Sequence, residues 1–127
     1  MSHFTKIRTR LYNLEILKKS LSDLNLNWTT ESTKIRGYQS ITHEAELVIK
    51  QDNKYDIGFK WNGKEYELVS DLMFWSQESS VEKFLNDINQ RYAYNAVLDV
   101  CEKEGFNFTR SEAKEDGSIK LTLRRFV

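Results

Sequence analysis

Proline is absent from this 127-residue chain, cysteine occurs once, histidine occurs twice, and neither sign of charge is in excess. The single cysteine, Cys101, excludes an intramolecular disulfide and cannot by itself build a zinc site. Nineteen basic and nineteen acidic side chains leave no basic excess, which a dedicated nucleic-acid binder uses to displace counterions. The apolar runs are too short for a membrane-spanning helix or for the core of a signal peptide. These absences favour a soluble intracellular protein without membrane insertion.

The residues that are present predict one folded domain over residues 1–127. Hydrophobic residues make up 39% of the chain and aromatic residues 13%, which argues against disorder despite 30% charged residues. A chain of this length is large enough for a single hydrophobic core and too small for two.

A β-hairpin over residues 55–69 is the most specific local prediction. Asn62 and Gly63 are the residues that a two-residue type I′ turn prefers, because both of its central positions have φ > 0. Such a turn places apolar pairs on one face of the hairpin and an opposite-charge pair on the other, as cross-strand energetics favour. The predicted register pairs Phe59 with Tyr66, Ile57 with Leu68 and Lys60 with Glu65.

The rest of the chain alternates strands with two helices. Alternating side chains predict a first strand over Phe4–Leu11, and an apolar stripe with helical spacing begins after Asn13, which can cap the helix. Together the elements predict an α+β domain in which a mostly antiparallel sheet packs both helices on one face. The other expected strands span 35–39, 44–50, 55–61 and 64–70, the last three as a meander, with a closing hairpin over 106–110 and 119–123.

The second helix has a clear start signal. Ser79 and Glu82 fit a capping box, in which a serine at the N-cap and a glutamate three residues later satisfy each other's backbone amides. An apolar stripe follows, but Val97 and Val100 rotate away from it around the helix axis. That drift indicates either a kink in the middle of the helix or a helix covered on two sides.

No residue pattern points to catalysis or to a metal centre. His3 and His43 lie far apart in the chain, without the cysteine or carboxylate spacing of a metal site. Cys101 falls on an apolar flank of the second helix, which is typical of an inert core residue. Asp56 and Glu67 fall on the polar face of the hairpin, where we expect solvated charges rather than a catalytic pair. We therefore expect no catalytic residue, no metal ligand and no cofactor.

Two segments around glycine and tryptophan offer candidate binding residues. Gly37 lies inside a predicted strand, where glycine marks a bulge or a close backbone approach. Arg36 and Tyr38 would then share one side and take a ligand there, although a purely structural bulge is the alternative. Trp75, in the apolar segment before the second helix, either plugs the end of the sheet or belongs to an exposed patch that receives a partner.

A third candidate lies on the second helix. Arg91 and Tyr94 point off its buried stripe and are available for contact. Interleaved basic and aromatic residues can also bind single-stranded nucleic acid by stacking, but one arginine in the run makes that hypothesis weak. The expected binding residues are therefore Arg36, Tyr38, Trp75, Arg91 and Tyr94, with His3 as a weaker addition.

Several strings of residues resemble one known family. They are MSHFTKI (1–7), RGYQ (36–39), YDIGF (55–59), WNGKEYEL (61–68) and QRYAY (90–94). They resemble the hypothetical chloroplast open reading frame family thirty-five, a domain of unknown function in algal plastid genomes and cyanobacteria, over essentially the whole chain. The resemblance implies a location in the plastid stroma, which the proline-free composition suits, and a link to photosynthetic or carbon metabolism. It supplies no catalytic residues.

Three hypotheses about function remain open at this point. The first is a non-catalytic accessory protein of the plastid stroma that binds another protein. The second is a nucleic-acid-associated regulatory factor, which would require the arginines to converge on one face. The third is a small enzyme of unknown reaction, which would require His3 to meet Arg36 or a carboxylate in a cleft. The sequence does not name the partner or the oligomeric state.

Overall fold

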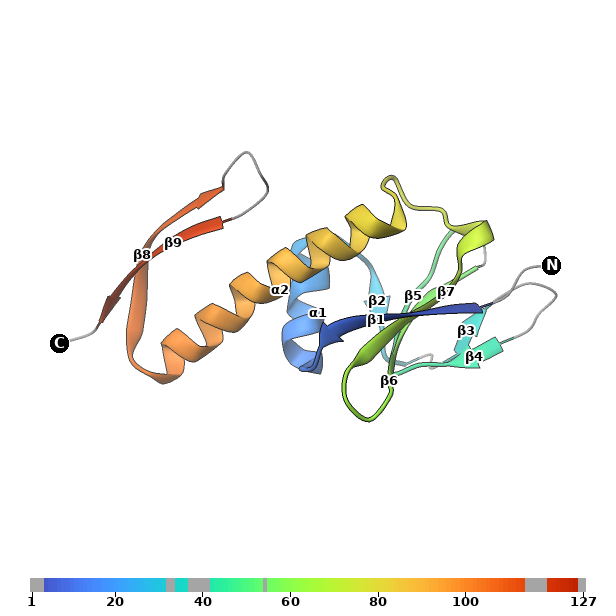
Figure 1. The fold of residues 1–127 in the computed structure, drawn as a ribbon, viewed down its shortest axis with the longest axis horizontal. Coiled ribbons are helices and arrows are strands. Elements are labelled where there is room, and N and C mark those ends of the chain that lie inside the picture. The colour runs from blue at the N-terminus through green and yellow to red at the C-terminus, as the bar shows by residue number, and fades with distance from the viewer. Residues whose placement is uncertain (1–3, 32–33, 37–41, 54, 114–118, 126–127) are drawn as a thin grey trace.

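The structure, a computed structural model, describes residues 4–31, 34–36, 42–53, 55–113 and 119–125. It combines β-strands and α-helices in one chain, which confirms the expected α+β class (Figure 1). In chain order the elements are β1 (Phe4–Leu11), α1 (Leu14–Asp23), β2 (Trp28–Thr29), β3 (Lys34–Arg36), β4 (Thr42–Glu44), β5 (Leu47–Ile49), β6 (Ile57–Trp61), β7 (Tyr66–Asp71), the 3-10 helix η2 (Leu72–Phe74), α2 (Val81–Lys103), β8 (Phe106–Ala113) and β9 (Ile119–Arg125).

The central layer is a five-stranded sheet with the strand order β1-β7-β6-β5-β2. Every pair of neighbours in it is antiparallel. The consecutive strands β5, β6 and β7 lie side by side, which confirms the predicted meander. The N-terminal strand β1 follows its predicted bounds and pairs with β7 at one edge of the sheet.

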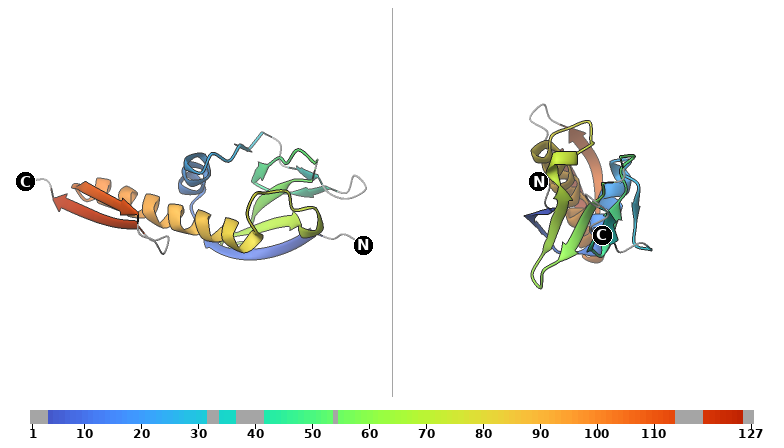
Figure 2. Two further views of the ribbon diagram at one scale, coloured as in Figure 1. Left: turned by 90° about the horizontal axis from the view of Figure 1, so that it is seen from above. Right: turned by 90° about the vertical axis from the view of Figure 1, so that its right-hand side faces the viewer.

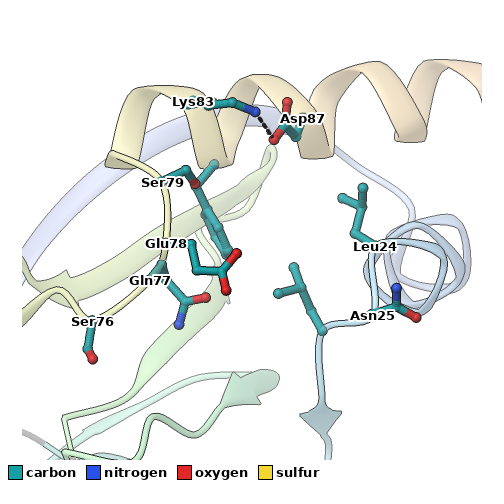
Figure 3. A pocket seen from close by; sticks show the side chains of 10 residues that line it. Leu24, Asn25, Ser76, Gln77, Glu78, Ser79, Lys83 and Asp87 are labelled. Atoms are coloured by element: carbon teal, nitrogen blue, oxygen red, sulfur yellow. Dashed lines mark hydrogen bonds and ion pairs between the residues drawn. The ribbon is translucent and has the colours of Figure 1, made fainter. Parts of the chain in front are cut away.

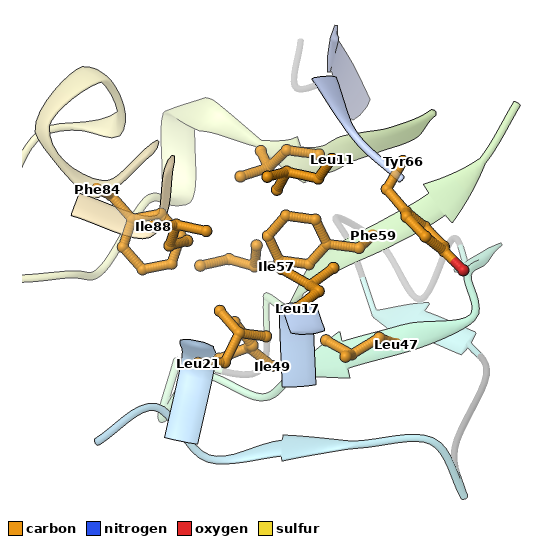
Figure 4. Close-up of a cluster of buried hydrophobic side chains, with 11 residues drawn as sticks. Leu11, Leu17, Leu21, Leu47, Ile49, Ile57, Phe59, Tyr66, Phe84 and Ile88 are labelled. Carbon is orange, nitrogen blue, oxygen red and sulfur yellow. The ribbon is translucent and has the colours of Figure 1, made fainter. Parts of the chain in front are cut away.

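The main hydrophobic core lies between one face of this sheet and both helices (Figure 4). Leu17 and Leu21 reach it from α1, and Phe84 and Ile88 reach it from α2. Phe59 on β6 is fully buried among them. Burying one such side chain stabilises a fold by roughly 1.5–3 kcal/mol, so this cluster fixes both helices on the sheet. The prediction of two helices on one face is confirmed.

The opposite face of the sheet carries a second, smaller core. Ile35 on β3 is fully buried there with Ala45, Val48 and Val69. Gly58 on β6 makes the approach possible, because a Cβ at this position would lie 2.2 Å from Ile35 Cδ1 and 3.0 Å from Ala45 Cβ. The β3–β4 hairpin therefore covers part of the face that we expected to be open to solvent.

The turn between β6 and β7 differs from the prediction. Trp61 pairs with Tyr66 and Phe59 with Leu68, so four residues, 62–65, form the loop instead of two. Gly63 has φ +100°, but Asn62 is not among the positive-φ residues, so the type I′ turn is wrong. The Asn62 side chain instead accepts hydrogen bonds from the backbone amides of Lys64 and Glu65, both at 2.9 Å. The register moves by two residues, which keeps every side chain on its predicted face.

Helix α2 begins one residue later than the capping box predicted. Ser80 is the N-cap, and its side chain accepts a hydrogen bond from the backbone amide of Lys83. Ser79 lies outside the helix and Glu82 falls at the second helical position, so the capping-box assignment is wrong. An acidic Glu82 in the first turn still interacts favourably with the helix dipole.

Helix α2 is continuous over its 23 residues. Its second half extends past the sheet, as Figure 1 and the left view of Figure 2 show. Val97 and Val100 on this half are 41% and 51% exposed, whereas Cys101, the third apolar residue that departs from the stripe, is buried. The helix ends before Gly105, whose φ is +78°. Beyond it β8 and β9 form a separate antiparallel hairpin at the far end of α2, which confirms the closing hairpin.

Candidate functional site

Arg36 and Asp56 form a two-pronged ion pair between β3 and the start of β6. Arg36 Nε donates to Asp56 Oδ2 at 2.9 Å, and Arg36 Nη2 donates to Oδ1 at 2.8 Å. The backbone amide of Arg36 also donates to Oδ2 at 2.8 Å. The hydrogen bonds to Asp56 raise the pKa of the Arg36 guanidinium above its usual range, against the opposing effect of burial.

The position of Asp56 corrects the sequence analysis, which placed it among solvated surface charges. Its side chain is fully buried, whereas that of Arg36 is 40% exposed. Alternation correctly placed the side chains of Asp56 and Ile57 on opposite faces of the sheet. The face that carries Asp56 is covered by β3 at this point. Arg36 therefore acts first as the counter-ion of a buried carboxylate, and its outer edge is what remains for contact.

Gln51 connects this ion pair to the loop that precedes α2. Its backbone oxygen lies 3.5 Å from Arg36 Nη2. Its side-chain Nε2 donates to the backbone oxygen of Tyr55 at 2.5 Å. Gln51 Oε1 accepts hydrogen bonds from the Ser76 backbone amide and from Gln77 Nε2, both at 2.9 Å. Because Gln51 is buried, these bonds hold the 76–77 segment against the body of the protein.

Trp75 plugs the end of the core, as the structural alternative proposed. Its ring meets Phe84 edge to face with 4.9 Å between centroids, and its Nε1 donates to the Ser79 oxygen at 2.8 Å. The side chain is half-buried, so only its rim faces solvent. Met73, two residues earlier, is 69% exposed.

The loop after Trp75 forms one side of an open pocket with a volume of about 710 Å³ (Figure 3). Phe84, Leu24 and Leu26 supply its apolar part, and the Lys83–Asp87 ion pair at 2.8 Å lies on its rim. Lys83 and Asp87 neutralise each other, so neither is an unpaired charge in the pocket. The lining combines apolar and polar side chains. Its lining comprises Leu24, Asn25, Leu26, Ser76, Gln77, Glu78, Ser79, Lys83, Phe84 and Asp87.

Arg91 and Tyr94 lie together on α2, at the junction with α1. The Arg91 guanidinium stands 4.3 Å from the centroid of the Tyr94 ring, within cation–π range. Arg91 Nε also donates to Asp23 Oδ2 at 2.8 Å. Both side chains are half-buried, so each keeps a solvent-facing part.

A polar cluster behind Arg91 joins the two helices. Asn95 is buried and donates from Nδ2 to Ser20 Oγ and to Asp23 Oδ2, both at 3.0 Å. Burial alone would raise the pKa of Asp23, but hydrogen bonds from Arg91 and Asn95 outweigh it, helped by the charges of Arg91 and Lys19. The pKa of Asp23 therefore lies below its usual value.

Tyr92, in the same QRYAY string, ties the helices together at the start of α1. Its hydroxyl accepts a hydrogen bond from the Asn13 backbone amide at 2.9 Å and one from the Tyr12 amide at 3.3 Å. Asn13 is the predicted N-cap of α1, and its side chain accepts from the Ile16 amide at 3.1 Å. This part of the family string therefore has a structural role.

The predicted binding residues thus fall into two groups. Arg36 and Trp75 are linked through Gln51 and the pocket loop, whereas Arg91 and Tyr94 stand at the α1–α2 junction. His3 and Tyr38 lie outside the described residues. Sequence reasoning missed Asp56, Gln51, Asn95 and the exposed valines of α2, because their environments come from segments distant in the chain.

Three of the arginines that the structure describes are engaged in ion pairs. Arg36 is paired with Asp56, Arg91 with Asp23, and Arg8 with Glu65 at 3.2 Å. Arg124 and Arg125 belong to β9 in the separate hairpin. Carboxylates therefore already neutralise three of the guanidinium groups that the nucleic-acid hypothesis invokes, and the convergence that it requires stays a prediction.

The described part of the chain has neither a membrane-spanning helix nor a cluster of metal-binding side chains. None of its helices combines the length and the apolar character needed to cross a bilayer. Within the same residues, no group of three or more histidine, cysteine, aspartate or glutamate side chains is arranged to hold a metal ion. Cys101 is buried, as predicted.

Comparison with known proteins identifies relatives but no activity. A family model described as "Protein of unknown function (DUF1257)" matches residues 20–122. Over 126 residues the chain is 51% identical to "Uncharacterized protein ycf35" of Guillardia theta, 43% identical to that of Pyropia yezoensis and 39% identical to that of Cyanophora paradoxa. Each alignment covers 99% of this chain and 98% of the relative. No solved structure matches.

Proposed function

Because this chain belongs to the DUF1257 family of proteins of unknown function, which includes the algal ycf35 proteins, we propose that it is a non-catalytic accessory protein that binds another protein. Its relatives are plastid-encoded, so the protein is assigned to the plastid. The proposal adds that it acts in the stroma and supports photosynthetic or carbon metabolism there.

The observation that carries the proposal is an exposed stripe along the second half of α2. Tyr94, Val97 and Val100 follow one another at intervals of three residues, so they lie along one side of the helix. Val97 and Val100 are the exposed valines of a helix half that extends beyond the sheet (Figure 1). Tyr94 beside them is a residue type enriched at binding hot spots. We call Tyr94, Val97 and Val100 the α2 stripe, and Arg91 lies on the opposite side of the helix from Val100.

The chemistry of the α2 stripe favours a protein partner that presents an apolar helix or loop. Valine side chains gain from leaving water but cannot stack on bases or pair with phosphates. Arg91 is already hydrogen bonded to Asp23, which reduces its value for neutralising a phosphate. The partner would bury the valines centrally, with Tyr94 on the rim.

A charge placed in the α2 stripe tests the proposal. Val97→Glu should keep the wild-type melting temperature, because the side chain is exposed, but should abolish recovery of a partner that co-purifies with tagged protein from plastid extract. Tyr12→Glu, at another exposed apolar residue, is the matched control and should retain the partner.

Two outcomes would contradict the proposal. One is recovery of the same partner by Val97→Glu and by the wild type. The other is tight binding of single-stranded RNA with a steep salt dependence, which would favour the nucleic-acid hypothesis instead.

A further inference from the structure

Strand β1 is an edge of the five-stranded sheet, and β7 is the only described strand that pairs with it. The two strands keep a continuous register from Phe4 opposite Asp71 to Arg8 opposite Glu67. The right view of Figure 2 shows β1 on the outside of the sheet. In an antiparallel pair, alternate residues turn their backbone N–H and C=O groups away from the neighbouring strand. The outer side of β1 therefore presents a row of backbone groups that a further strand can pair with.

A bulge ends the regular part of this edge after Arg8. The register shifts between Arg8 and Leu11, and Arg10 has a positive φ of 61°. The Thr9 hydroxyl holds the bulge from inside, because it donates to the Tyr66 backbone oxygen and accepts a hydrogen bond from the Leu11 amide at 3.1 Å. The strand at the other edge, β2, has only two residues, so β1 is the longer edge of the sheet.

Basic side chains dominate the exposed part of β1. Four side chains of the strand are exposed, and three of the four are cationic; they are those of Thr5, Lys6, Arg8 and Arg10. Arg8 pairs with Glu65 at 3.2 Å, whereas no ion pair is found for Lys6 or Arg10 among the described residues. The edge therefore attracts a strand with acidic side chains and repels one with basic side chains, such as β1 of a second copy.

We propose that β1 receives an extended acidic segment of a partner protein, which adds to the five-stranded sheet as a further strand. The backbone of this segment pairs with the outward N–H and C=O groups of residues 5–8. Its acidic side chains lie beside Lys6 and, past the bulge, beside Arg10. In such strand addition the main-chain hydrogen bonds supply affinity, and the side chains at alternate positions supply specificity. The inference is independent of the α2 stripe, which lies on the half of α2 that extends beyond the sheet (Figure 1).

Titration of the full chain with the blocked peptide Thr-Glu-Val-Glu-Val-Glu-Thr, followed by NMR, tests the inference. Saturable shifts are expected for the backbone amides of β1, and its outward amides should exchange more slowly with solvent, because peptide carbonyls accept hydrogen bonds from them. Lys6→Glu should weaken binding by about threefold to tenfold, as the reversal of one exposed charge predicts. Lys50→Glu makes the same charge change at an exposed lysine just after β5, three strands away from β1, and should bind as the wild type does.

N-methylation of the third and fourth peptide residues separates strand addition from charge attraction alone. Adjacent residues of a strand point their N–H groups to opposite sides, so this change removes one N–H that faces β1 in either register and leaves the charge of the peptide unchanged. The methylated peptide should not bind, and neither should a peptide with lysine in place of each glutamate.

The inference is overturned if the methylated peptide binds as the parent peptide does, or if Lys6→Glu and Lys50→Glu weaken binding equally. It is also overturned if the shifts do not saturate, as for an edge whose cations only keep other strands away. Displacement of the acidic peptide by single-stranded RNA would overturn it as well, by assigning the cations of β1 to nucleic acid.

Discussion

At the scale of single residues, Arg36 and Asp56 form an ion pair in which the carboxylate is fully buried. A fully buried carboxylate is unfavourable unless charge and hydrogen bonds satisfy it, and Asp56 receives three hydrogen bonds from Arg36 alone. The two residues also come from separate family strings, RGYQ and YDIGF. The Arg36–Asp56 ion pair thus gives a structural reason for one residue in each of the two strings.

Removal of one partner of this pair should destabilise the protein. Arg36→Gln leaves Asp56 buried without its counter-ion, and the free energy of unfolding should fall by about 2–4 kcal/mol, below the usual upper range because Arg36 is 40% exposed. Arg36→Gln combined with Asp56→Asn should recover part of the loss, because no charge then remains buried. Urea denaturation of the three proteins measures this. If Arg36→Gln alone is as stable as the wild type, the Asp56 carboxylate does not depend on Arg36 as its counter-ion.

At the scale of secondary-structure elements, Gly58 decides how the β3–β4 hairpin packs. The missing side chain on β6 is the space that Ile35 fills, so two segments separated by more than twenty residues interlock on the back of the sheet. Without that contact the second face would carry Val48 and Val69 exposed to solvent. The glycine therefore serves close approach here rather than a special backbone conformation, since its φ is not in the positive range.

A double-mutant cycle tests this interlocking. Gly58→Ala should destabilise the protein by about 1–3 kcal/mol, because its Cβ would overlap a fully buried side chain. In an Ile35→Ala background the same change should cost much less, since the overlapping atoms are gone. The measurement is the denaturant midpoint of each variant. Equal costs in both backgrounds would contradict the packing of β3 on β6.

At the scale of the whole molecule, the junction of α1 and α2 determines where the projecting half of α2 lies. Asp23 receives hydrogen bonds from both Arg91 and Asn95, and Tyr92 holds the N-terminus of α1. Tyr92 also packs against the main core. These contacts orient the projecting half of α2, so the α2 stripe depends on this junction.

Acid should weaken this junction. The pKa of Asp23 is lower in the folded protein than its usual value of 3.8, so its contribution to stability is complete above that value and is lost as the pH falls through the folded pKa. Asp23→Asn should therefore be less stable than the wild type at pH 7, with a gap that narrows below about pH 4.

Urea midpoints between pH 7 and pH 2 measure that gap, and an Arg91→Gln background is the control. The narrowing should be smaller there, because one of the hydrogen bonds that lowers the pKa of Asp23 is missing. A gap that is as wide at pH 2 as at pH 7 would contradict the assigned role of Asp23.

Features that depend on near neighbours could be predicted from the residue pattern alone. The alternation in 4–11, the Asn13 cap and the meander follow from residues close together in the chain, and all three were predicted. The errors in the Ser80 cap and the 62–65 loop are shifts of one or two residues, because adjacent residues with similar propensities compete for one position.

Only the tertiary structure decided which polar groups are buried and which apolar groups are not. Asp56 lies on the face that alternation assigned to it, yet it is buried because β3 comes from twenty residues earlier in the chain to cover that face. Val97 and Val100 are of a residue type that is usually buried in a core. They remain exposed because α2 extends beyond the sheet that it packs on. Burial depends on what the rest of the chain places nearby, and local periodicity carries no information about that.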